Sequence, residues 1–244
     1  MIRNAVKIST MKHAMYQGGA VLCIQKTHVE ANLSTVIYDK IKDDIIEMRR
    51  LPDSFVLERQ VAAEYETSRT PVREALKRLM QEGWLVGEDR RRLQVSQLTL
   101  AYCYDAFAVR TMIEKHAIRE IFARGETRSL AGKLDAEMRK MDALKDDAIA
   151  MVRADLGFHT VIVEHLDNLL LTRVWRSISD EIARIVIFAM DEERHPDVIL
   201  KEHRKIVEAL WDQQTDIITS LDAHMNGILQ GIERTFEQYE LTRR

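Results

Sequence analysis

The chain has 244 residues, of which 46% are hydrophobic and 31% are charged. This is enough apolar material for one large domain or two small domains with cores of their own, so a largely disordered chain is excluded. Only 9 Gly and 3 Pro interrupt long stretches of good helix formers. The composition therefore favours a mostly α-helical protein.

Cysteine content and hydropathy exclude two further classes. Cys23 and Cys103 are too few for a disulfide framework, which suits a reducing compartment and predicts a cytoplasmic protein. No run approaches the roughly 18 consecutive apolar residues that span a bilayer, so we expect no membrane partner. The net charge of −3 does not exclude a nucleic-acid partner, because a basic face can lie within an acidic whole.

Three short helices are predicted after a flexible N-terminal tail over residues 1–32. The first helix begins at Ser34 and ends near Pro52, with apolar residues at helical spacing. A second covers about 57–65, and a third follows a tight break and is ended by Gly83. Helices with these gaps suit a helix-turn-helix, and we expect a DNA-binding domain over residues 33–97.

The third helix of this domain carries a basic N-terminal end, whereas the preceding segment, 34–67, is acidic overall. In a helix-turn-helix this end points into the major groove, where Arg can read guanine and hydroxyls can bind phosphate. Two short strands, 84–86 and 93–95, are predicted to flank a charged tip as a wing. The alternative is that the basic side chains of the third helix only form its solvent-exposed face.

One segment of the chain resembles the signature of GntR-family regulators, namely Ser68-Arg69-Thr70-Pro71-Val72-Arg73-Glu74-Ala75-Leu76, followed by Glu82-Gly83-Trp84-Leu85. The resemblance runs from about 34 to 95 and implies a winged helix-turn-helix. It also implies DNA contacts by five matching residues: Arg59, Ser68, Arg69, Thr70 and Arg73. The family often has glycine at the wing tip, where this chain has Asp89-Arg90-Arg91-Arg92, so we expect Arg90 to engage a narrow minor groove by its charge instead.

The remainder, residues 98–240, is predicted to be an antiparallel bundle of about six helices that binds an effector and forms the dimer. In its third helix, about 148–166, His159 lies on the core-facing stripe and Asp155 lies one turn before it. His203 and His224 lie on the apolar stripes of the fifth and sixth helices. Three histidines and one aspartate are therefore expected to face one interior.

Buried imidazoles and a buried carboxylate cost several kcal/mol unless they find partners. A divalent cation would satisfy all four groups together, and these nitrogen and oxygen ligands suit Zn, Ni or Mn. For any one of these histidines, an ordinary hydrogen-bonded core residue is the simpler interpretation. The set of four favours a metal site.

A second resemblance is carried by Asp155-Leu156-Gly157-Phe158-His159 together with His203 and His224. This pattern is similar to that of the FCD effector domain in the FadR branch of the GntR family. The resemblance implies that Asp155, His159, His203 and His224 bind the metal and that a metabolite carboxylate completes the coordination. Arg110 could clamp such an anion or pair with Glu114, and Arg184 is a second candidate for the effector site.

These patterns predict a transcriptional regulator and not an enzyme, with a repressor responding to a small carboxylate metabolite as the leading hypothesis. One recognition helix buries too little DNA for tight specific binding, so we expect a homodimer on a palindromic operator. A competing hypothesis is a metal-dependent hydrolase with an accessory DNA-binding domain. A third is a regulator whose metal is purely structural.

Overall fold

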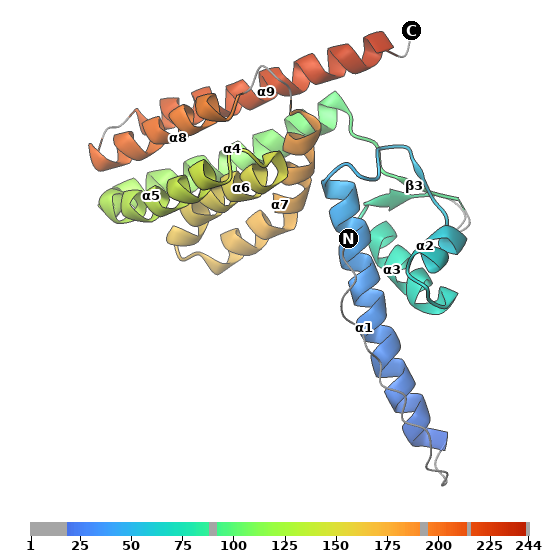
Figure 1. Cartoon of the computed structure of the whole chain (residues 1–244). Coiled ribbons are helices and arrows are strands. Elements are labelled where there is room, and N and C mark those ends of the chain that lie inside the picture. The colour runs from blue at the N-terminus through green and yellow to red at the C-terminus, as the bar shows by residue number, and fades with distance from the viewer. Residues whose placement is uncertain (1–18, 88–91, 191–194, 214–215, 243–244) are drawn as a thin grey trace.

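The computed structural model describes residues 19–87, 92–190, 195–213 and 216–242. Its described part contains α1 (Gly19–Ile46), β1 (Phe55–Val56), α2 (Glu58–Glu64), α3 (Arg69–Gln81), β2 (Leu85–Val86), β3 (Leu93–Val95), α4 (Leu100–Ala123), α5 (Thr127–Ala143), α6 (Ala148–His165), α7 (Leu169–Phe188), α8 (Pro196–Trp211) and α9 (Ile217–Thr242). The helices α1 to α3 and the small sheet lie to one side, and α4 to α9 form a bundle on the other (Figure 1). The mostly α fold class, with a winged helix-turn-helix followed by a helical bundle, is confirmed. Among the described helices, no segment has the length and hydropathy that crossing a membrane requires.

The core of the N-terminal unit is formed where α1 packs against α3. Ile37, Ile41 and Ile45 recur one turn apart on α1 and are fully buried. They join Val72 and Leu79 of α3 in one apolar cluster. Burial of each such side chain contributes about 1.5–3 kcal/mol, so this contact fixes α3 with its opposite face toward solvent.

The first helix is longer than the sequence predicted. It begins at Gly19, so residues 19–32 extend a helix where we expected a flexible tail. No Pro and no further Gly occurs between residues 20 and 46. Nothing in the backbone therefore stops the helix from extending N-terminally beyond Ser34. A serine can occupy a helix interior, and capping chemistry alone does not fix a helix start.

The wing is a three-stranded antiparallel sheet in the order β1-β3-β2. Strands β2 and β3 were predicted, whereas β1 was not, because its partner strand β3 lies far away in the sequence and no local pattern marks the pairing. Phe55 pairs with Gln94, which ties the loop after α1 to the wing. The tip, with Arg90, lies outside the described residues.

In the C-terminal bundle, capping side chains mark the starts of α4, α6 and α7. Thr99 accepts a hydrogen bond from the backbone N–H of Tyr102 at the start of α4, and Asp147 caps α6 in the same way. Asn168 accepts from the N–H groups of Leu170 and Leu171 at the start of α7. Such caps satisfy backbone donors that have no partner within the helix, so they fix where α4, α6 and α7 begin.

Helices α6 and α7 hold the N-terminal unit against the bundle. Ala183 and Ile187 of α7 are buried in the same apolar cluster as the α1 isoleucines. On the same helix, Asp180 forms an ion pair with Lys42 of α1 at 2.7 Å. The DNA-binding unit is therefore fixed to the bundle by both apolar and charged contacts along α7.

We expect Asn168→Ala to lower the free energy of unfolding by about 1 kcal/mol, because two backbone donors at the start of α7 lose their acceptor. Urea denaturation followed by circular dichroism would measure the change. Arg173→Ala, an exposed substitution one turn along the same helix, should stay within about 0.5 kcal/mol of the unchanged chain. Equal effects for both variants would contradict the capping role.

Candidate metal centre and nucleic-acid interface

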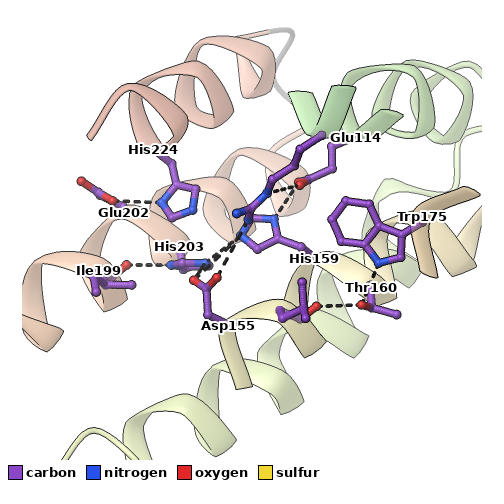
Figure 2. Close-up of polar contacts among 11 residues, drawn as sticks. Glu114, Asp155, His159, Thr160, Trp175, Ile199, Glu202, His203 and His224 are labelled. Atoms are coloured by element: carbon purple, nitrogen blue, oxygen red, sulfur yellow. Dashed lines mark hydrogen bonds and ion pairs between the residues drawn. The ribbon is translucent and has the colours of Figure 1, made fainter. Parts of the chain in front are cut away.

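Four of the predicted site residues meet inside the bundle. Asp155 and His159 come from α6, His203 from α8 and His224 from α9. One ligating atom of each lies within 4.8 Å of those of the other three, and all four residues are buried (Figure 2). The structure thus brings together the full set that the sequence singled out.

Packing around the group sets the spacing of the imidazoles. Phe158, fully buried on α6, meets the rings of His159 and His203 edge-on, with centroid distances of 5.3 and 4.6 Å. The ring of His224 stacks on that of His159 at 5.1 Å. These contacts hold the three imidazoles around one point.

Each imidazole is also held through its Nδ1 atom. The partner of His159 Nδ1 is Glu114 Oε2 at 2.6 Å, and that of His203 Nδ1 is the carbonyl oxygen of Ile199 at 2.8 Å. His224 Nδ1 lies 2.9 Å from Glu202 Oε2. Carboxylates and carbonyls only accept, so Nδ1 carries the proton on each ring and Nε2 presents a lone pair.

The Nε2 atoms converge without a donor between them. Those of His159 and His203 are 3.2 Å apart, and Asp155 Oδ1 lies 3.0 Å from His203 Nε2. His224 Nε2 is buried and has no hydrogen-bond partner among the described residues. Lone pairs and a carboxylate at these distances repel one another unless a cation lies between them, so the donor set fits a divalent metal ion.

Protonation states at the group agree with this geometry. Burial lowers the pKa of His159 despite the nearby Glu114 carboxylate. Burial, together with the neighbouring imidazoles, lowers the pKa of His224 well below its usual value. For Asp155, burial acts to raise the pKa, but the adjacent side chains, including the permanently charged Arg110, outweigh burial and hold the pKa well below the usual range. Neutral imidazoles and an ionised carboxylate are the forms that bind metals.

Arg110 lies beside this group, fully buried on α4. Its Nε donates to Glu114 Oε1 at 2.9 Å, so the pairing that the sequence left open is present. Its Nη1 and Nη2 atoms have no hydrogen-bond partner among the described residues, and Nη2 lies 3.9 Å from Asp155 Oδ2. Two unpaired guanidinium donors therefore remain at the group, where an anion could accept from them.

Arg184, the other predicted effector residue, is placed elsewhere. Its Nη1 donates to Ser96 Oγ at 2.9 Å and its Nη2 to the Ser96 carbonyl oxygen at 2.5 Å. Ser96 lies in the link between β3 and α4. The side of α7 on which Arg184 lies brings its guanidinium to this link, which apolar neighbours in the sequence did not reveal. The structure brings Arg184 to the domain junction and not to the histidines.

A cavity of about 170 Å³ leads to the same group. Among the described residues that line it, Asp155 is the charged one, and most of the others are apolar, among them Val152, Val186 and Ile199. A ligand in this cavity would meet a polar end at Asp155 and apolar walls elsewhere.

Five of the predicted DNA-contacting residues are exposed on the helix-turn-helix. The Arg69 and Arg73 side chains at the start of α3 are 62% and 56% exposed, and Ser68, Thr70 and Arg59 are exposed as well. The opposite face of α3 packs against α1. The basic end of α3 is therefore presented outward, as docking in a groove requires.

One residue at this surface was missed by the sequence reasoning. Glu58 Oε2 forms an ion pair with Arg73 Nε at 2.8 Å, and Glu58 Oε1 lies 4.0 Å from Arg69 Nε. The three residues lie within 15 positions of one another, but Glu58 is on α2 and the arginines are on α3. The periodicity of a single helix therefore could not predict their contact. Only the angle between the two helices brings them together.

Two family models match the chain. Residues 33–95 match the bacterial regulatory proteins of the gntR family, and residues 105–227, just over half of the 244, match the FCD domain. The protein belongs to the GntR family and carries an FCD domain. It is a transcriptional regulator and not an enzyme.

Relatives of this GntR-family regulator carry names of the same kind. The Nta operon transcriptional regulator of Aminobacter aminovorans is 27% identical over 73% of this chain and 86% of its own length. A probable D-xylose utilization operon transcriptional repressor of Paenarthrobacter nicotinovorans is 29% identical over 72% of this chain and 79% of its own length. The hydrolase alternative finds no support in these relatives.

Solved structures share the fold. E. coli McbR/YncC matches with a TM-score of 0.65 at 17% identity, covering 85% of this chain and 98% of its own. A putative GntR regulator from Rhodococcus sp. RHA1 matches with a TM-score of 0.66 at 19% identity, covering 82% of this chain and 96% of its own. At this identity the likeness is one of fold.

We expect Zn²⁺, Ni²⁺ or Mn²⁺ added to chelator-treated protein to raise its melting temperature, because an ion bound only by the native state stabilises that state. At 100 times Kd the gain is about 2.7 kcal/mol. His203→Ala removes one donor and should lose most of the shift. His116→Ala, which removes an exposed histidine from α4, should keep it. Scanning fluorimetry measures the shifts, and unchanged melting with all three ions would contradict the site.

Proposed function

We propose that this regulator is a cytoplasmic, metal-dependent repressor that senses a small carboxylate metabolite. The observation that supports this most strongly is the convergence of three Nε2 lone pairs and the Asp155 carboxylate beside the unpaired donors of Arg110. Such a group is costly to bury if it binds nothing. Its place in the bundle beside a DNA-binding unit suits a sensor.

Asp155, His159, His203 and His224 would hold the metal ion, with Zn, Ni and Mn as the ions that suit these ligands. A bound divalent cation would supply a positive centre to which a carboxylate oxygen can bind. Glu114, Glu202 and the Ile199 carbonyl fix the three imidazole rings through their Nδ1 atoms. Loss of such an outer partner commonly weakens metal binding about 10- to 100-fold.

The effector is proposed to be a small carboxylate with a short apolar body. Its carboxylate would accept from Arg110 Nη1 and Nη2, whose direction is fixed because Nε is held by Glu114. Its apolar part would lie against Val152, Val186 and Ile199 in the cavity. A strongly polar body would lose hydration there without gaining partners.

The same cavity walls connect the effector site to the DNA-binding unit. Val152 is buried in the cluster that contains the α1 isoleucines, and Val186 packs against that cluster. A ligand that moves these two side chains changes the surface on which α1 rests. Arg184 and Asp180 on α7 would carry the shift to Ser96 and Lys42.

DNA binding is proposed to need two copies of the chain on a palindromic operator. The basic end of α3 is a small surface for tight specific binding, and paired half-sites are the usual solution. Repression agrees with relatives whose names describe repressors, such as that of Paenarthrobacter nicotinovorans. An effector-induced change in half-site spacing would then lower operator affinity.

Native mass spectrometry of the purified protein tests the effector site. We expect a dimer that carries metal and a small anion as added mass. Arg110→Ala should keep the metal but lose the anion, because two guanidinium donors disappear while the histidines remain. Arg184→Ala, whose guanidinium contacts Ser96, should keep both. Anion retained by Arg110→Ala and lost by Arg184→Ala would contradict the assignment.

Mobility shifts on a duplex enriched from a random library test the DNA surface. Arg69→Ala and Arg73→Ala should each weaken binding by about 1–3 kcal/mol, the discrimination that one bidentate arginine contact supplies. Arg139→Ala removes an exposed arginine on α5 and should leave affinity unchanged. Unchanged binding by both α3 variants in folded protein would rule out α3 as the recognition helix.

A further inference from the structure

One carboxylate lies between the two arginines of the recognition helix. Glu58, the first residue of α2, pairs with Arg73 Nε at 2.8 Å and approaches Arg69 Nε to 4.0 Å. The Glu58 side chain is only 16% exposed, whereas both arginines are more than half exposed. The carboxylate is thus at the inner side of the basic surface and the guanidinium groups are at its outer side.

A carboxylate in this place opposes DNA affinity. It cancels part of the positive charge that phosphates meet, and it approaches the phosphates itself once the surface is docked. Removing it would therefore be expected to strengthen sequence-independent binding. Because the charge of Glu58 opposes DNA affinity, its place beside the arginines is better explained by an effect on the orientation of their guanidinium groups.

We propose that Glu58 is a specificity-determining positioning residue, which orients Arg73, with Arg69 beside it, toward guanine. The inference rests on the proposed DNA contacts of α3. Glu58 occupies the Nε edge of the Arg73 guanidinium. Since the guanidinium is planar, holding one edge fixes the direction of the Nη donors, which are the atoms that read O6 and N7 of guanine.

Two physical effects then favour the matching base. An arginine held in advance loses less side-chain freedom when it binds the correct base, so the matched complex gains. At a mismatched base the fixed guanidinium cannot turn to a phosphate without leaving Glu58, so the carboxylate loses its partner beside DNA. Both effects widen the difference in binding free energy between matched and mismatched DNA sites. The affinity for DNA in general is lower than it would be without the carboxylate.

Selection of bound duplexes from a random DNA library, followed by sequencing, measures this difference without a known operator. We expect Glu58→Gln to lower the preference for guanine by about 5-fold or more at one or two positions of each half-site. Its affinity for random duplex should rise severalfold, because a negative charge is lost. Glu58→Asp keeps the charge but shortens the side chain, so it should lose preference without that gain.

Glu66→Gln is the matched control, since it removes an exposed carboxylate from the turn between α2 and α3. It should raise affinity for random duplex and leave the selected motif unchanged. Thermal melts of every variant separate a local effect from unfolding. If Arg73→Ala lowers the preference for guanine in the selected motif but Glu58→Gln leaves this preference as strong as in the unchanged chain, this inference alone is overturned. A motif that Arg73→Ala leaves intact, or no enriched motif at all, overturns the proposed contacts and this inference together.

Discussion

The structure depends on one constraint, which is that three buried histidines are protonated on the outer nitrogen and leave the inner one bare. Glu114, Ile199 and Glu202 each accept at an Nδ1 position, so the Nε2 lone pairs point at one another and at a carboxylate. In a low-dielectric interior, hydrogen bonds of this kind are strong and unmet ones are costly. The bundle therefore encloses a group of lone pairs and one carboxylate that a positive charge would stabilise.

Helices α6 and α7 connect the group of histidines to the surface on which α1 of the DNA-binding unit packs. The cavity beside Asp155 and the surface under α1 share the side chains of Val152 and Val186, so the two cannot change independently. Close-packed interiors transmit displacement because they have little free volume. Helix α7 also carries Arg184, whose hydrogen bonds hold the link between the two domains at Ser96.

The DNA-binding surface shows the opposite use of charge. In the bundle, opposite charges are buried together, whereas on α3 the arginines remain exposed and one carboxylate lies behind them. Full neutralisation would remove the attraction for phosphate, and full exposure would leave the guanidinium groups without direction. The pairing of Glu58 with Arg73 lies between these extremes.

The sequence by itself determined the helices of the bundle, the helix-turn-helix and the inward faces on which Asp155, His159, His203 and His224 lie, because each depends on local spacing along a helix. That these four residues meet at one point depends on how α6, α8 and α9 pack. The sequence misjudged what depends on contacts between elements. The two-residue strand β1 exists only through its pairing with β3, and the start of α1 at Gly19 is not marked by any capping pattern. The site of Arg184 at the domain junction, and the pairing of Glu58 with Arg73, follow from how helices cross. Periodicity states which face of a helix is apolar, but only tertiary packing decides which neighbour that face meets.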